Sequence, residues 1–139
     1  MKKVCLMPGV EEVVFDNGLT LAMERVPDYP LISLVLAIKV GSAYEEINGI
    51  SHLVEHLVFS GDAKFSEKRL KQIMKRQRAY IEAATYQFVT TYSVYFLPDF
   101  ISQNFELLYR VIKNRDYKIS IVKKELLEEV FEELGNEVN

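Results

Sequence analysis

The chain has 139 residues, of which 49% are hydrophobic and 12% aromatic, and this composition is sufficient for one folded domain over residues 1–139. Its 17 basic and 20 acidic residues give a formal net charge of −3, so no broad basic field indicates a nucleic-acid partner. The single cysteine cannot form an internal disulfide, and no apolar run is long enough to span a membrane. We therefore expect a cytoplasmic protein with neither a nucleic-acid nor a membrane partner.

The first elements predicted along the chain are the two strands of a β-hairpin. Residues 11–15 and 19–24 are rich in strand-forming residues, and Asn17-Gly18 lies between them. An asparagine–glycine pair supplies the positive φ angles that a tight hairpin turn needs. The next apolar run, residues 31–40, favours a central strand that is buried on both faces.

The predicted helix that follows carries the only two histidines of the sequence. On a helix, His52 and His56 lie one turn apart on the same face and can bind one ion together, with Glu55 beside them. A zinc ion lowers the pKa of water, and a nearby carboxylate can take the proton. The alternative is an ordinary amphipathic helix with two histidines at the border of its apolar face. We expect Asn48 to cap this helix and Gly61 to end it.

The rest of the chain predicts further helices and strands in an α+β fold, mainly an antiparallel sheet packed against helices. The predicted helices cover residues 66–78, 99–113 and 120–134, and the predicted strands cover residues 80–85 and 90–96. Leu126 and Leu127 of the last helix are expected to face inward. This helix also contains glutamates that could complete a metal site: Glu125, Glu128, Glu129, Glu132 and Glu133. Glu125, Glu129 and Glu132 share one face, and their spacing does not choose among them.

Three segments of the sequence together resemble the pitrilysin/insulinase family of zinc metallopeptidases, which includes the mitochondrial processing peptidase. Residues 41–45 contain a Gly-Ser-x-x-Glu step, residues 48–61 contain the inverted His-x-x-Glu-His motif, and residues 126–130 contain a Glu-Glu-aliphatic sequence. The resemblance implies the N-terminal αβ half-domain of a pitrilysin-type peptidase, truncated just after the last metal ligand.

Carried over to this chain, the resemblance implies that His52 and His56 bind Zn²⁺, that Glu129 is the third ligand and that Glu55 is the general base. It also implies a peptide-binding strand formed by three residues: Ala83, Ala84 and Thr85. Several positions depart from the family, among them residues 77–80, which replace the glycines usual before this strand. Val122 stands where the family often has a further glutamate, seven residues before the ligand, and Glu82 stands where the family has asparagine.

We therefore expect a zinc-dependent, processing-peptidase-like metallopeptidase that hydrolyses peptide or unfolded polypeptide substrates. A second homologous half, a homologous subunit or another copy of the chain is expected to complete the cleft, because exposed apolar faces favour association. Two alternatives stay open: a non-catalytic partner subunit, and an inactive fragment that retains a metal site.

Overall fold

A computed structural model of the chain describes residues 2–61, 66–113 and 116–137, without the side chains of residues 3–6 and 129–137. The chain divides into two compact units, Met1–Pro30 and Leu31–Asn139, and each is described by itself. The expectation of one domain over the whole chain stays a prediction. Within the described part, no helix combines the length and the apolar character needed to cross a membrane.

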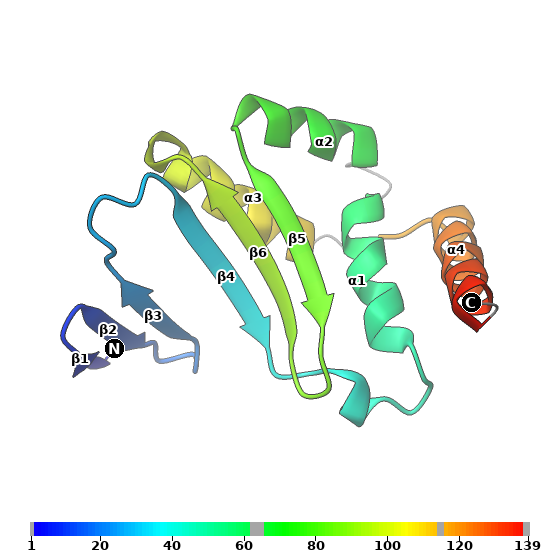
Figure 1. Cartoon of the computed structure of the whole chain (residues 1–139), viewed down its shortest axis with the longest axis horizontal. Coiled ribbons are helices and arrows are strands. Elements are labelled where there is room, and N and C mark those ends of the chain that lie inside the picture. Colours follow the sequence, from blue (N-terminus) through cyan, green and yellow to red (C-terminus); the bar gives the residue numbers. More distant parts are fainter. Residues whose placement is uncertain (1, 62–65, 114–115, 138–139) are drawn as a thin grey trace. The chain divides into compact units, whose positions relative to one another are not determined.

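The first unit consists of three antiparallel strands: β1 (Lys2–Met7), β2 (Val10–Val14) and β3 (Thr20–Glu24), paired in that order (Figure 1). The predicted hairpin of β2 and β3 is confirmed, but its turn differs from the expected one. Only Gly18 takes a positive φ, 85°, and the Phe15 N–H donates to the Leu19 carbonyl at 2.8 Å. The loop therefore has three residues with glycine at the left-handed position, a common hairpin alternative to the two-residue turn.

The second unit contains another antiparallel sheet, formed by β4 (Ile32–Ile38), β5 (Tyr80–Thr85) and β6 (Thr90–Phe96). Its strand order is β4-β6-β5 (Figure 1). The prediction that residues 31–40 form a central strand buried on both faces is wrong, because β6 takes the centre and β4 lies at an edge. Burial along β4 alternates, and Val35 is 52% exposed on the face opposite the core.

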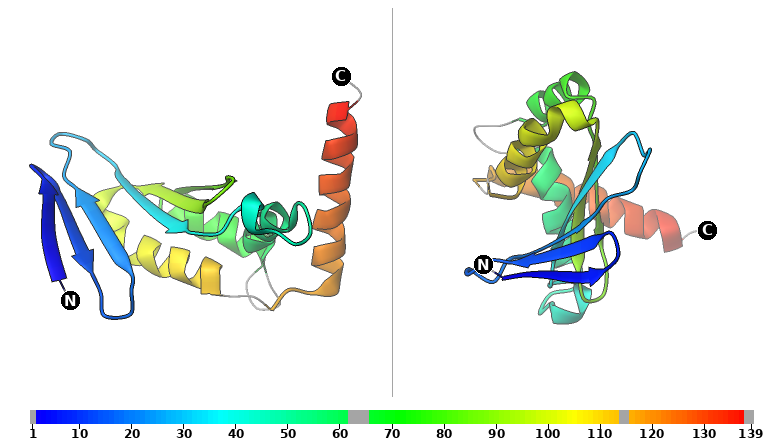
Figure 2. Two further views of the ribbon diagram at one scale, coloured as in Figure 1. Left: turned by 90° about the horizontal axis from the view of Figure 1, so that it is seen from below. Right: turned by 90° about the vertical axis from the view of Figure 1, so that its left-hand side faces the viewer.

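Four α-helices accompany this sheet: α1 (Ile50–Ser60), α2 (Glu67–Arg76), α3 (Ile101–Lys113) and α4 (Ile119–Glu137). Two short 3₁₀ turns, η1 (Ser42–Tyr44) and η2 (Pro98–Phe100), precede α1 and α3. Helices α1, α2 and α3 lie on one face of the sheet (Figure 2), and the core between them contains Val58, Leu70, Val94, Phe96 and Leu108. The predicted α+β class is confirmed.

The opposite face of the β4-β6-β5 sheet carries no helix among the described residues. Ser33, Val35 and Ala37 of β4 lie exposed on it, whereas their neighbours along the strand pack towards the core. Leu126 and Leu127 of α4, which are predicted to face inward, are 46% and 59% exposed, as expected for an apolar face that the chain leaves without cover. Helix α4 contacts α1, and among its described side chains Ile119 is also exposed.

Candidate metal and peptide site

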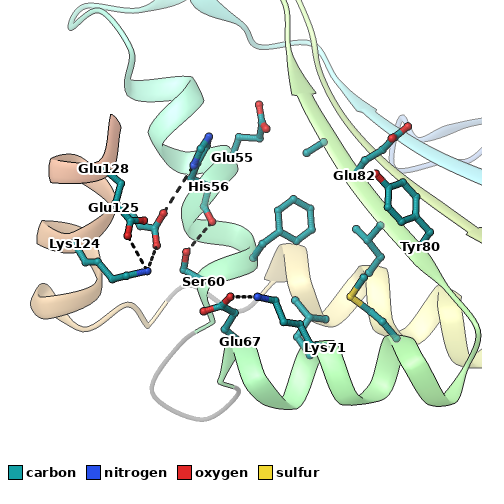
Figure 3. A pocket seen from close by; sticks show the side chains of 15 residues that line it. Glu55, His56, Ser60, Glu67, Lys71, Tyr80, Glu82, Lys124, Glu125 and Glu128 are labelled. Carbon is teal, nitrogen blue, oxygen red and sulfur yellow. Dashed lines mark hydrogen bonds and ion pairs between the residues drawn. The ribbon is translucent and has the colours of Figure 1, made fainter. Parts of the chain in front are cut away.

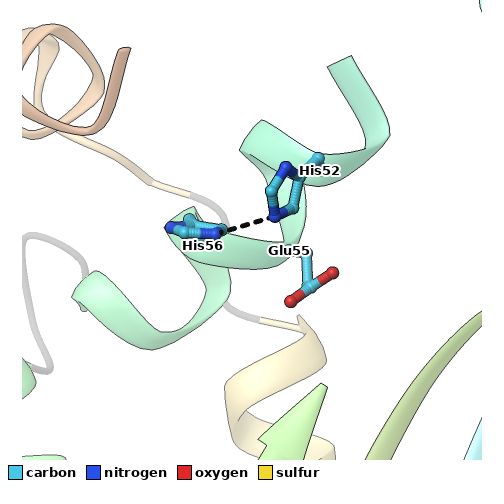
Figure 4. A group of neighbouring side chains, drawn as sticks. All are labelled: His52, Glu55 and His56. Carbon is cyan, nitrogen blue, oxygen red and sulfur yellow. Dashed lines mark hydrogen bonds between the residues drawn. The ribbon is translucent and has the colours of Figure 1, made fainter. Parts of the chain in front are cut away.

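Helix α1 brings the two histidines and the glutamate of the motif together, as their spacing predicts. The Nε2 atoms of His52 and His56 are 3.0 Å apart, and the two rings are nearly perpendicular, at 85°. One nitrogen of each histidine and one carboxylate oxygen of Glu55 all lie within 4.8 Å of one another (Figure 4). Two imidazoles and a carboxylate on a partly exposed helix face are a donor set that fits Zn²⁺.

The N-terminus of α1 is held by a carboxylate from the preceding loop. Glu45 accepts hydrogen bonds from the Gly49 N–H at 2.9 Å and from the Ser51 N–H at 2.7 Å. The predicted capping role of Asn48 is therefore wrong: Gly49, with φ of 84°, occupies the cap position, and Glu45 satisfies the first N–H groups. Hydrogen bonds from Ser51, and then from Gly49, hold the pKa of Glu45 below its ordinary value. This anchors the turn that carries His52.

The hydroxyl of Thr85, at the end of β5, donates a hydrogen bond of 2.6 Å to Oε2 of Glu55. Thr85 is one of the three predicted peptide-binding residues, but no local sequence pattern predicts this contact, which joins residues 30 positions apart. Together with Ala83 and Ala84, Thr85 lines a hollow that also contains His52 and Glu55. Strand β5 therefore meets the motif on α1 directly.

The ladder between β5 and β6 determines which backbone groups of β5 stay available. Hydrogen-bonded pairs alternate in an antiparallel ladder. The Tyr86 N–H donates to the Val89 carbonyl at 2.8 Å, and Thr85 pairs with Thr90 in the next position. The backbone N–H and C=O groups of Thr85 and Ala83 therefore point away from β6. They face an edge on which the described residues place no further strand.

A hollow of about 510 Å³ lies beside the motif, between α1, α2, β5 and α4 (Figure 3). Its apolar wall includes Phe59, Leu70 and Met74, and its charged residues include Glu67, Lys71, Lys124, Glu125 and Glu128. The wall can contact an apolar side chain. Of the charged residues, Glu125 is buried, Glu67 is half-buried and the other three are exposed at the border of the hollow.

Helix α4 places Glu125 next to the second histidine. Glu125 is 6% exposed, and its Oε2 lies 3.8 Å from Nδ1 of His56, on the ring side opposite Nε2 (Figure 3). Glu125 is one of the three glutamates that share one helix face, and their spacing alone does not single it out. The side chain of Glu129, the predicted third ligand, lies outside the described residues, so its role stays a prediction. Glu125 itself stands seven residues before Glu132.

The loop before α1 is fastened to the turn after β5 by backbone hydrogen bonds. The N–H groups of Ser42 and Ala43 donate to the carbonyls of Tyr86 and Gln87, at 3.1 and 2.8 Å. A Cβ atom at Gly41 would lie 2.1 Å from the Tyr86 carbonyl oxygen, so only glycine fits this approach. This backbone clamp connects the two segments that carry the motif and the free strand edge.

Comparisons with known proteins agree with the geometry. The sequence profile of the family described as Insulinase (Peptidase family M16) matches residues 20–138. A probable mitochondrial-processing peptidase subunit beta of Schizosaccharomyces pombe is 27% identical over 86% of this chain and 26% of its own length. The uncharacterized zinc protease YmxG of Bacillus subtilis is 26% identical over 84% of this chain and 29% of its own length.

A solved structure shares the fold. The crystal structure of a protease from Helicobacter pylori superposes with a TM-score of 0.75 at 24% identity, covering 84% of this chain and 29% of that one. The chain thus spans about a quarter of the length of the curated relatives that it matches.

Proposed function

The chain belongs to the insulinase family of peptidases, and from this premise we propose that it forms the metal-binding part of a zinc-dependent peptidase that hydrolyses peptide bonds. The observation that carries the proposal is the placement of His52, Glu55 and His56 on one helix face, beside the free edge of β5.

His52 and His56 would hold the zinc ion, and α4 would supply the third ligand. The family resemblance assigns that ligand to Glu129. The burial of Glu125 beside His56 favours Glu132 instead, because the family often has a second glutamate seven residues before the ligand. Zinc content of the variants Glu129→Gln and Glu132→Gln distinguishes the two assignments, because only loss of the true ligand strips the ion.

The chain's own residues divide the remaining tasks among them. When bound, zinc lowers the pKa of a water molecule and polarises a peptide carbonyl. Glu55 takes the proton of the attacking water, and the hydrogen bond from Thr85 fixes the direction of its carboxylate. Glu125, next to Nδ1 of His56, stabilises the orientation of that imidazole.

We propose that the substrate is a peptide or an unfolded polypeptide that adds as a strand to the free edge of β5. The outward backbone groups of Ala83 and Thr85 can pair with it, as in other cases of strand addition. Alternate side chains of such a strand point to opposite faces. One set reaches the hollow lined by Phe59, Leu70 and Met74, and the other set reaches the open face of the sheet.

The direct test is to measure zinc content and peptide hydrolysis for three variants. His56→Ala is expected to lose zinc and activity. Glu55→Gln is expected to keep zinc and to lose about 100-fold or more in hydrolysis, because the base is gone while the ligands stay. Glu106→Gln, at an exposed site on α3, is the control and is expected to change neither quantity. Stoichiometric zinc in His56→Ala would contradict the site.

The alternative proposal is a non-catalytic partner or an inactive fragment that retains the metal. Zinc binding without any hydrolysis, also after addition of a homologous half, would support it. We propose that activity needs a second homologous subunit or another copy of this chain, because Leu126 and Leu127 present apolar surface. Light scattering at several dilutions, beside the hydrolysis assay, tests this. Full activity of a strict monomer would contradict it.

A further inference from the structure

The three strands of the β4-β6-β5 sheet place one charged residue on its open face, and this residue lies on β5, the edge strand beside α1. The strand sequences of β4 and β6 contain no Asp, Glu, Lys or Arg, and that of β5 contains only Glu82. Glu82 is exposed and points to the same face as Tyr80 and Ala84, because side chains alternate along a strand. This carboxylate therefore dominates the charge of the open face next to the proposed peptide strand.

Two tyrosines flank the carboxylate of Glu82. The Tyr95 hydroxyl donates to Oε1 of Glu82 at 2.8 Å, and this hydrogen bond raises the pKa of Tyr95. The rings of Tyr80 and Tyr95 lie 6.2 Å apart, tilted by 32°, and Tyr80 is 61% exposed. Figure 3 shows Tyr80 and Glu82 projecting from β5. Among the described residues, no cationic group forms an ion pair with Glu82.

The ladder register places Glu82 where an added strand comes closest. Glu82 faces Ser93 of β6, while the backbone groups of its neighbours Ile81 and Ala83 point to the free edge. Relative to an added antiparallel strand, Glu82 thus occupies a non-hydrogen-bonded position, where opposing Cα atoms are about 4.5 Å apart and side chains are nearest.

We propose that Glu82, Tyr80 and Tyr95 form a subsite that selects a basic side chain of the bound peptide, on the open face of the sheet. The inference rests on the proposed function, because it takes the peptide to lie along β5. The carboxylate pairs with a guanidinium or an ammonium group, and the tyrosine faces contribute cation–π attraction. The hydrogen bond from Tyr95 holds one carboxylate oxygen, which leaves the other to face the ligand.

Binding of matched peptides to the Glu55→Gln chain tests this subsite without hydrolysis. Fluorescein-labelled peptides of about ten residues of alanine and serine carry one arginine, moved position by position, or citrulline in its place. Citrulline keeps the shape and removes the charge. Measured by anisotropy with zinc present, arginine is expected to bind about 3- to 10-fold more tightly than citrulline at one position.

The second-site variants identify the residues responsible. Adding Glu82→Gln is expected to bring the arginine-to-citrulline affinity ratio to about one, and adding Tyr95→Phe is expected to reduce it, since each removes a cause of the selection. Adding Glu106→Gln, an exposed carboxylate on α3, is expected to leave it unchanged. Peptide binding with a ratio unaffected by Glu82→Gln, or with no arginine preference at any position, would overturn the subsite and leave the proposed peptidase intact. Failure of every peptide to bind would overturn the strand-edge substrate site and this inference together.

Discussion

The hydrogen bond from Thr85 to Glu55 makes the orientation of the proposed base measurable. Thr85→Val keeps the volume and the β-branched shape of the side chain and removes only the donor. Hydrogen bonds to charged groups contribute about 1.5–3 kcal/mol, and the lower end applies because both side chains are partly exposed. A loss of about 1.5–2 kcal/mol lowers kcat roughly 10- to 30-fold. KM for a peptide is expected to change little, because the backbone of β5 is untouched.

The assay for this prediction is hydrolysis of a quenched fluorescent peptide by the zinc-loaded protein, with zinc measured by elemental analysis. Thr85→Ser keeps the hydroxyl and is expected to restore most of kcat. Thr90→Val is the matched control, because Thr90 lies opposite Thr85 in the ladder and its hydroxyl donates to the Val40 carbonyl at 2.8 Å. It is expected to lower thermal stability and to leave kcat near that of the unchanged protein.

Two results would refute the reasoning about Thr85. The first is a kcat for Thr85→Val within about twofold of the unchanged protein while zinc stays bound, a change too small for a lost base orientation. The second is an equal loss of kcat in Thr85→Val and Thr90→Val, which would show that the loss comes from lower stability of the protein and not from the orientation of Glu55.

Three further predictions follow from other contacts of the site. Glu125→Gln is expected to weaken zinc binding by about 10- to 100-fold, because it removes the charge beside His56; competition with a chelator measures this. Hydrogen bonds lower the pKa of Glu45 in the folded state below 4.5, so the ionised carboxylate stabilises the fold above pH 4.5, and this stabilisation is lost as the pH falls through the lowered pKa. Glu45→Gln is therefore expected to flatten this part of the curve of melting temperature against pH. Gly41→Ala is expected to lower the free energy of unfolding by about 1–3 kcal/mol, because its Cβ meets the Tyr86 carbonyl; denaturant unfolding tests it.

Local patterns in the sequence predicted the parts of the site that depend on one element. The i, i+4 spacing was enough to bring His52 and His56 together, since any regular helix does so. Contacts between elements were not predictable in this way. The capping of α1 by Glu45, the bond from Thr85 to Glu55 and the approach of Glu125 to His56 all depend on how separate segments pack.

The errors in the fold prediction have a similar cause. An apolar run such as residues 31–40 indicates a strand with buried side chains, but it does not show whether the strand pairs with another strand along both of its edges. β6 occupies the central position of the sheet. Its sequence mixes polar and aromatic residues, yet its alternate side chains Tyr92, Val94 and Phe96 are buried against the helices. In the β2–β3 turn, only Gly18 adopts a positive φ, whereas the asparagine–glycine pair predicts a turn with positive φ angles at both residues.

The backbone clamp between η1 and the β5–β6 turn determines which substitutions are tolerated at the positions that form it. Its bonds run from the N–H groups of Ser42 and Ala43 to the carbonyls of Tyr86 and Gln87, so they do not depend on the identity of the four side chains. A saturation scan should therefore find these positions permissive to most residues except proline at 42 and 43, which lacks the N–H. Gly41 should be intolerant, because the carbonyl of Tyr86 occupies the space of a side chain. The position of the loop before α1 relative to the end of β5 therefore depends little on which side chains occupy these four positions.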